Sequence, residues 1–188
     1  MSDDAPSAAG LPARRKQGTV LLVSGELDKA LLAFEVAAGF QAMGMQMSMW
    51  FVLYGVNCLR QPRSIFSPAK WFGHLRHGPG RVPETDSVLQ HVVCGLNHEG
   101  ADHLPLSQLN YGGLGPLILR RIMRRKGMAQ LDELIRGAQS IGVRFTICQI
   151  CVDAMALAVP DDLIVAAEVK GVSSYYLDVA AADYNAVF

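Results

Sequence analysis

The residues of this sequence best suited to chemistry are two cysteines in the stretch RFTICQICVD, residues 144–153. Cys148 and Cys151 are separated by two residues, a spacing that occurs in redox pairs and in metal sites. If Cys148 lies where a strand turns into a helix, free backbone N–H groups and the helix dipole would favour its thiolate. Structural burial, thiol chemistry and metal binding all stay open for this pair, because free cysteines also serve as small core residues.

The other possible metal ligands form a weaker pattern. Cys58 and Cys94 make no second pair of the same spacing, and a zinc site needs four ligands. All five histidines lie between residues 74 and 103, near Cys94, but scattered loop histidines are commoner than metal sites. We therefore expect no metal and no cofactor. Cys94 is the candidate for a second mobile thiol, with a half-buried core cysteine as the alternative, and Cys58 is expected to be structural.

Composition favours one soluble domain. The chain has 188 residues, of which 51% are hydrophobic and 18% charged. Lys plus Arg equals Asp plus Glu at 17 each, so no global field favours nucleic acid. The few cysteines and the lack of an apolar signal segment at the start indicate the cytoplasm.

One uncharged stretch, Val36–Leu59, is long enough at 24 residues to span a bilayer. Gly39 and Gly44 interrupt it, and methionines then alternate with polar residues at the period of a strand. This pattern predicts the end of a helix, a turn and a buried strand. Peripheral membrane contact remains an alternative.

Strand and helix patterns alternate along the chain. Residues 1–17 are expected to be a disordered leader, and residues 18–188 a single domain with a long variable connection at about 61–113. The alternation predicts an α/β fold with a mainly parallel five-stranded sheet and helices on both faces. Reactive groups in such folds gather beyond the carboxyl ends of strands, where Cys148 would lie. The predicted strands are Val20–Val23, Met45–Tyr54, Val143–Ile147, Ile164–Val169 and Ala186–Phe188.

Three of the predicted helices have an apolar stripe. Ser24 is expected to cap the first, which follows it directly. The second, at residues 116–126, should turn Ile118, Leu119, Ile122 and Met123 to the core, and the third, at 129–139, should turn Leu131, Leu134, Ile135 and Ala138 inward. Five basic residues between Arg120 and Lys126 predict a solvated face, with an acidic partner or anionic lipid as alternatives.

Three blocks in this order, SGELDKA, LSQLNYGGLGP and GVRFTICQICVD, resemble the DsrE/DsrF-like family of sulfur-transfer proteins. The resemblance is closest to its larger single-domain branch, some members of which carry peroxiredoxin-type names. It runs from about Val20 to Phe188 and fails mainly between Gln61 and His103. It implies a doubly wound, Rossmann-like domain that forms homo-oligomers or complexes with related subunits, and in which a cysteine carries sulfur as a persulfide.

The family cysteine at the end of this strand corresponds to Cys148. Many relatives have serine at the position of Cys151, so the second thiol here either resolves a persulfide by closing a disulfide or is a small neutral substitution. The glycine-rich turn NYGGLGP is expected to wall the sulfur pocket and to offer backbone N–H groups to an anion. The residues of that wall would be Asn110, Gly112, Gly113 and Gly115.

The expected function is that of a sulfur carrier or sulfurtransferase with a persulfide on Cys148. Its partners would be a low-molecular-weight persulfide or sulfur-donor protein and an acceptor sulfur-carrier protein. The main alternative is a non-catalytic binding or assembly subunit of a sulfur-metabolism complex, with membrane association left open. A thiol peroxidase ranks third, since no matching active-site motif is present. Asp153 is expected to be a local helix carboxylate rather than a base, because a carboxylate beside Cys148 would disfavour a thiolate there.

Overall fold

Five strands run parallel in one sheet of the computed structural model, which describes residues 14–61, 100–155, 157 and 159–188. Their order is β4-β3-β2-β1-β5, so the chain builds outward from β1 in one direction and then places β5 on the other side. The predicted α/β fold with a five-stranded parallel sheet is confirmed. The strands are β1 (Gln17–Leu22), β2 (Gln46–Phe51), β3 (Arg144–Cys148), β4 (Glu168–Lys170) and β5 (Tyr184–Val187).

All five strands differ from the expected bounds by one to four residues at each end, and β2 ends at Phe51 rather than Tyr54. β1 begins at Gln17, ahead of the predicted start, because Gln17 already pairs with Gln46 of β2. β4 begins at Glu168 rather than Ile164. The backbone N–H of Ile164 donates to the carbonyl of Leu59 at 2.9 Å, which holds this part of the chain away from the sheet.

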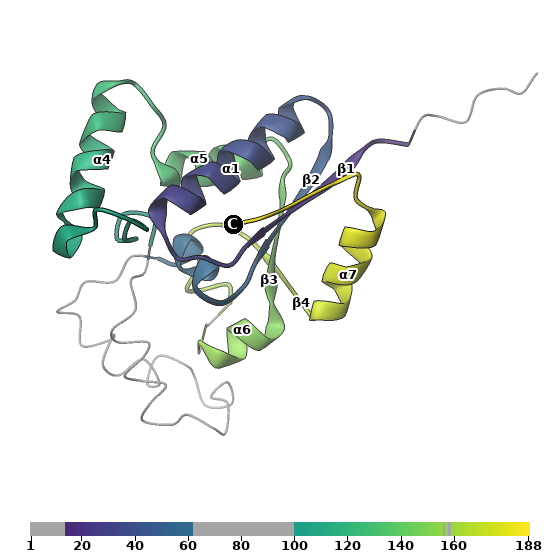
Figure 1. Ribbon diagram of the computed structural model, residues 1–188. Coiled ribbons are helices and arrows are strands. Elements are labelled where there is room, and N and C mark those ends of the chain that lie inside the picture. Colours follow the sequence, from purple (N-terminus) through teal and green to yellow (C-terminus); the bar gives the residue numbers. More distant parts are fainter. Residues whose placement is uncertain (1–13, 62–99, 156, 158) are drawn as a thin grey trace, which may run out of the picture.

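Helices cover both faces of the sheet, with α1 and α5 on one side and α7 on the other (Figure 1). Successive side chains of β2 point to opposite faces of the sheet. Phe51 contacts Phe34 of α1 with ring centroids 5.8 Å apart, whereas Trp50 donates from Nε1 to Asp178 of α7 at 2.8 Å. These helices are α1 (Leu27–Ala42), α5 (Leu131–Ser140) and α7 (Val172–Ala181).

The uncharged stretch Val36–Leu59 folds as predicted at its start. It forms the end of α1, a turn in which Gly44 adopts a φ of +89°, and the buried strand β2. A positive φ favours glycine, so this residue ends the helix and redirects the chain. Across the described ranges, none of the helices combines the length and apolarity that crossing a membrane requires.

A turn of 3-10 helix, η1 (Leu53–Leu59), follows β2 and passes very close to the end of β1. A Cβ atom on Gly55 would lie 2.1 Å from the carbonyl oxygen of Leu22, so only glycine fits there. The backbone N–H of Gly55 also donates to the carbonyl of Val23 at 2.9 Å. This close approach sets the path of the chain beyond the carboxyl end of β2.

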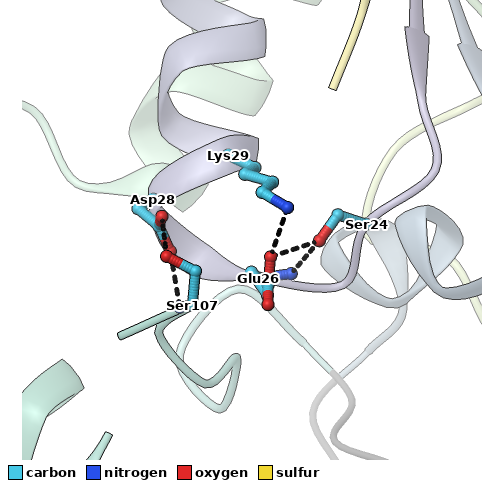
Figure 2. A network of polar contacts seen from close by, with 5 residues as sticks. All are labelled: Ser24, Glu26, Asp28, Lys29 and Ser107. Atoms are coloured by element: carbon cyan, nitrogen blue, oxygen red, sulfur yellow. Dashed lines mark hydrogen bonds and ion pairs between the residues drawn. The ribbon is translucent and has the colours of Figure 1, made fainter. Parts of the chain in front are cut away.

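Polar contacts hold the N-terminus of α1 (Figure 2). The prediction that Ser24 caps this helix is wrong, since Glu26 occupies the cap position. The Ser24 hydroxyl instead donates to the Glu26 carboxylate at 2.8 Å, and Lys29 forms an ion pair with the same carboxylate at 2.9 Å. Ser24 therefore holds the side chain of the N-cap residue Glu26 and makes no capping hydrogen bond to the helix.

A second set of contacts ties a distant segment to α1. Asp28 accepts the backbone N–H of Ser107 at 3.0 Å and its hydroxyl at 2.6 Å (Figure 2). The N–H of Leu27 donates to the carbonyl of Pro105 at 2.7 Å. Burial opposes ionisation of Asp28, but the hydrogen bonds from Ser107 outweigh it and hold the pKa of Asp28 below its ordinary value.

The predicted core face of the helix α4 (Leu114–Arg125) is half right, since Leu119 packs against the core as expected. Met123 is buried as expected, but Ile118 is 59% exposed and Ile122 is 47% exposed. The helix has two apolar stripes, and Gly115 decides which one faces inward. A Cβ on Gly115 would lie 2.0 Å from the carbonyl oxygen of Leu109, so this side packs tightly on the preceding turn.

Part of the chain lies outside the described residues. This part includes most of the expected leader, residues 1–13, and most of the long connection, residues 62–99. Cys94 and four histidines belong to it, so the proposals for a second mobile thiol and for the histidine-rich segment fall there. Within the described portion, Arg14 forms an ion pair with Asp183 at 3.3 Å, so contacts with the domain begin before residue 17.

Replacing Asp28 with asparagine should lower the free energy of unfolding by about 1 kcal/mol at neutral pH, because a charged acceptor of two exposed hydrogen bonds is lost. The folded-state pKa of Asp28 is depressed, so this stabilisation is present above the unfolded-state pKa and is lost as the pH falls through the folded-state pKa. Urea unfolding at graded pH measures the difference. An equal loss in Asp161→Asn, or a difference that does not shrink as the pH falls below the ordinary aspartate pKa of about 3.9, would contradict this account.

Replacing Gly55 with alanine should destabilise the protein by about 2–4 kcal/mol, because the new methyl group meets the backbone of β1. Gly137→Ala is the matched control, since nothing lies within 4 Å of its added Cβ in the exposed part of α5. That change should stabilise the protein by about 0.5–1 kcal/mol. Thermal unfolding of both variants tests the pair, and similar melting temperatures would show that the close approach is absent.

Candidate functional site

The two cysteines lie where β3 meets the short helix α6 (Gln149–Ala154). Cys148 is the last residue of the strand and the N-cap of the helix, with φ −67° and ψ 129°. Cys151 follows in the first turn, close enough to Cys148 for the neighbouring thiol to raise its pKa. The structure therefore confirms the strand-to-helix position expected for Cys148 and brings the pair together as free thiols.

Cys151 is held by the chain that leaves β2. Its Sγ accepts the backbone N–H of Leu53 at 3.0 Å. Burial raises the pKa of the Cys151 thiol above its ordinary value, the Leu53 N–H partly offsets this, and the neighbouring Cys148 raises it further. Cys151 is therefore a thiol that resists ionisation, which makes it a poor first nucleophile.

Both thiols are almost fully covered, with 5% of Cys148 and 4% of Cys151 exposed. Large apolar side chains stand at the surface on the same two segments, Leu53 at 52%, Tyr54 at 53% and Ile150 at 66%. A reactant must therefore either reach a small opening or displace part of this covering. The exposed apolar groups would suit contact with another molecule.

Leu53 is the residue that sequence reasoning missed. It is not glycine, yet its φ is +47°, a strained backbone conformation for a leucine. This conformation directs its N–H to Cys151 and leaves its side chain exposed. No sequence signal marks such a position, because a leucine after a buried strand looks like ordinary core.

Buried charges beside this region also escaped the sequence analysis. Arg60 is 2% exposed and Asp162 is 4% exposed. They lie on segments joined by the Arg60–Leu163 bridge and by a hydrogen bond from the N–H of Gln61 to the carbonyl of Asp162 at 2.8 Å. Each of these charged residues stands two positions from a proline, and nothing in the sequence indicated that it would be buried.

The glycine-rich turn forms a separate structure at the start of α4. Its first residues are the 3-10 turn η3 (Tyr111–Gly113), and Gly112 and Gly113 have φ values of +63° and +98°. The carbonyl of Asn110 accepts the N–H of Gly113 at 2.7 Å and of Gly115 at 3.2 Å. α4 and α6 lie apart in Figure 1, so the structure does not bring these residues to the thiols.

The remaining predicted residues have local roles. Cys58 is buried, donates to the carbonyl of Gly55 at 3.1 Å, and has its pKa raised strongly by burial, as a core residue would. Asp153 is exposed and accepts the side-chain amide of Gln149 at 3.0 Å. His103 is exposed. Across residues 14–61 and 100–188, wherever the chain is described, no group of at least three His, Cys, Asp or Glu could hold a metal ion.

Comparisons with known proteins agree with the fold of the chain. The model of the DsrE/DsrF/DrsH-like family matches residues 14–75 and 74–187. A Bacillus subtilis (strain 168) protein, named uncharacterized protein YrkE, is 26% identical over 170 residues, which are 90% of this chain and 95% of that protein. The crystal structure of the ychN protein from E. coli covers 93% of this chain and 99% of its own, with a TM-score of 0.51 at 9% identity, so the likeness is one of fold. The chain belongs to the DsrE/DsrF/DrsH-like family.

Proposed function

We propose that the protein is a sulfur carrier that relays sulfane sulfur as a persulfide on Cys148. The observation that carries the proposal is the placement of Cys148 at the carboxyl end of a central parallel strand, with a second thiol one helical turn away. This edge of an open parallel sheet is where reactive groups gather. Membership of a family of sulfur-relay proteins supports the same reading.

The transfer needs no net oxidation. The Cys148 thiolate attacks the outer sulfur of a donor persulfide, R–S–SH, and forms Cys148–S–SH. The donor sulfur–sulfur bond breaks, and the inner sulfur leaves as the thiolate R–S⁻. An acceptor thiolate then attacks the outer sulfur of Cys148–S–SH and regenerates the Cys148 thiolate. The donor is a low-molecular-weight or protein persulfide, and the acceptor is a sulfur-carrier protein.

Cys151 is suited to a later step. Its raised pKa keeps it protonated while Cys148 reacts, and its sulfur lies beside that of Cys148. Once ionised, it can attack the inner sulfur of the persulfide, forming a Cys148–Cys151 disulfide and releasing HS⁻. A dithiol reductant then restores both thiols by taking up the oxidising equivalent.

The second candidate is a non-catalytic binding or assembly subunit. Two observations favour it, the near-complete burial of both thiols and the exposed apolar side chains on α7 and β5. Those side chains are Val172, Tyr176, Leu177 and Val187. A scaffold would use such a surface to associate, and its cysteines would be core residues. Sulfur loading distinguishes the two candidates.

Incubation with glutathione persulfide should add one sulfur atom to the protein, and a reducing thiol should remove it. Cys148→Ser should lower this loading to background, whereas Cys58→Ser and Cys94→Ser should retain it. Intact-mass spectrometry measures the addition. Cys151→Ser should still load but should release less sulfide. Full loading of the Cys148 variant would exclude Cys148 as the carrier, and no loading of the wild type would favour the scaffold.

Alkylation of the native protein should label Cys148 before Cys151, and should label Cys58 only after denaturation. Because the pKa of Cys151 is raised, its labelling should shift to higher pH than that of an ordinary thiol, whose pKa is about 8.5. Peptide mass spectrometry after short iodoacetamide exposure at graded pH ranks the sites. Earlier labelling of Cys151 would reverse the roles of the two cysteines.

A further inference from the structure

A second surface, far from the thiols, joins apolar and basic side chains on α4. Six large apolar residues on this helix and the turn before it are 47–71% exposed. They are Leu109, Tyr111, Leu114, Leu117, Ile118 and Ile122. A run of exposed aliphatic groups on one helix face is uncommon in a protein surface that meets only water.

The packing of α4 fixes this orientation. Gly115, Pro116 and Met123 face the protein and are buried. Arg120 is half-buried and donates to the carbonyl of Ala101 at 3.2 Å, which anchors the middle of the helix. Because these contacts hold one side of α4 against the protein, the apolar side chains on the opposite side of the helix remain exposed.

The basic residues of α4 lie toward its C-terminus, and most of the exposed apolar residues lie toward its N-terminus. Arg121, Arg124 and Arg125 are exposed, and α4 contains four arginines and no acidic residue. A hollow of about 790 Å³ runs along the helix and is lined by leucine, isoleucine and arginine side chains, with Asp102 as the one acidic side chain among its described lining residues. Figure 1 shows α4 at the outer edge of the molecule.

We propose that α4 docks on an anionic phospholipid surface, with its N-terminal leucines and isoleucine in the acyl boundary and its arginines among the lipid phosphates. Charge complementarity selects this occupant. A second copy is disfavoured, because a two-fold contact would bring the arginines of both α4 helices into one interface with no acidic residue on α4 to pair with them. A protein partner is disfavoured by the leucines of the stripe, since leucine is under-represented among the hot spots of protein interfaces.

The axial spacing fits this mode of binding. At about 1.5 Å per residue, Arg121 and Arg125 lie about 10–16 Å behind Leu114 along the helix. Interfacial segments bury their apolar part about 5–10 Å into the boundary between headgroups and acyl chains. The leucines can therefore enter the acyl boundary while long arginine side chains remain at the level of the phosphates.

Flotation of the full chain with vesicles tests the proposal. The protein should float with vesicles of equal parts phosphatidylcholine and phosphatidylglycerol and not with phosphatidylcholine alone. Arg121→Glu with Arg125→Glu should weaken binding by about 25-fold or more, from about fivefold per arginine. Leu117→Ser with Ile118→Ser should weaken it by about tenfold, because less apolar surface is buried.

The matched control is Arg15→Glu with Arg136→Glu, the same change of charge at exposed positions outside α4. It should bind within about twofold of the wild type, since screened charges act only near the surface. Circular dichroism confirms that each variant is folded. Equal loss of binding in the control, or no effect of the Leu117 and Ile118 changes, would overturn the proposal. Absence of wild-type flotation, with an oligomer that the Leu117 and Ile118 changes dissociate, would assign this face to a second copy instead.

Discussion

The contacts around the two thiols depend on the parallel register between β2 and β3. Phe51 pairs with Ile147, so both strands end at the same level of the sheet. The chain that leaves β2 at Leu53 therefore meets the chain that leaves β3 at Cys148, and one N–H reaches Cys151. A shift of one residue would turn Cys148 to the other face and remove this contact.

The same geometry affects the thiols in two ways, because burial protects them from solvent and also opposes their ionisation. Cys58 and Cys151 are both buried thiols with raised pKa values, but Cys58 donates to a backbone carbonyl whereas Cys151 accepts an N–H. An accepted hydrogen bond favours the thiolate, so the Leu53 N–H offsets part of the effect of burial on the pKa of Cys151. Leu53 supplies that hydrogen bond through a strained backbone, which is the kind of cost found at functional positions.

The fold also separates the thiols from α4. The Asp28–Ser107 contacts tie the segment before α4 to the start of α1. Gly115 then sets the rotation of α4 against the carbonyl of Leu109. Coverage of the thiols and exposure of the α4 stripe thus arise from different contacts, and the proposed lipid docking and the proposed sulfur relay can be tested independently.

The sequence by itself determined the parallel five-stranded sheet and the position of Cys148. Both depend on local information, since apolar periodicity and chain order fix strands and crossover helices. It also placed the inward stripe of α5, where Leu131, Ile135 and Ala138 are buried. The buried side of α5 could be predicted because only one stripe of that helix is apolar.

Tertiary structure alone decided the features that depend on contacts between distant segments. Half of the predicted core face of α4 was wrong. Ile118 and Ile122 belong to a second apolar stripe beside Leu119 and Met123, and only the approach of Leu109 to Gly115 distinguishes the two stripes. The contact between Leu53 and Cys151 joins residues 98 positions apart. No local pattern encodes such a pair, because it exists only once parallel strand ends have met at one edge of the sheet.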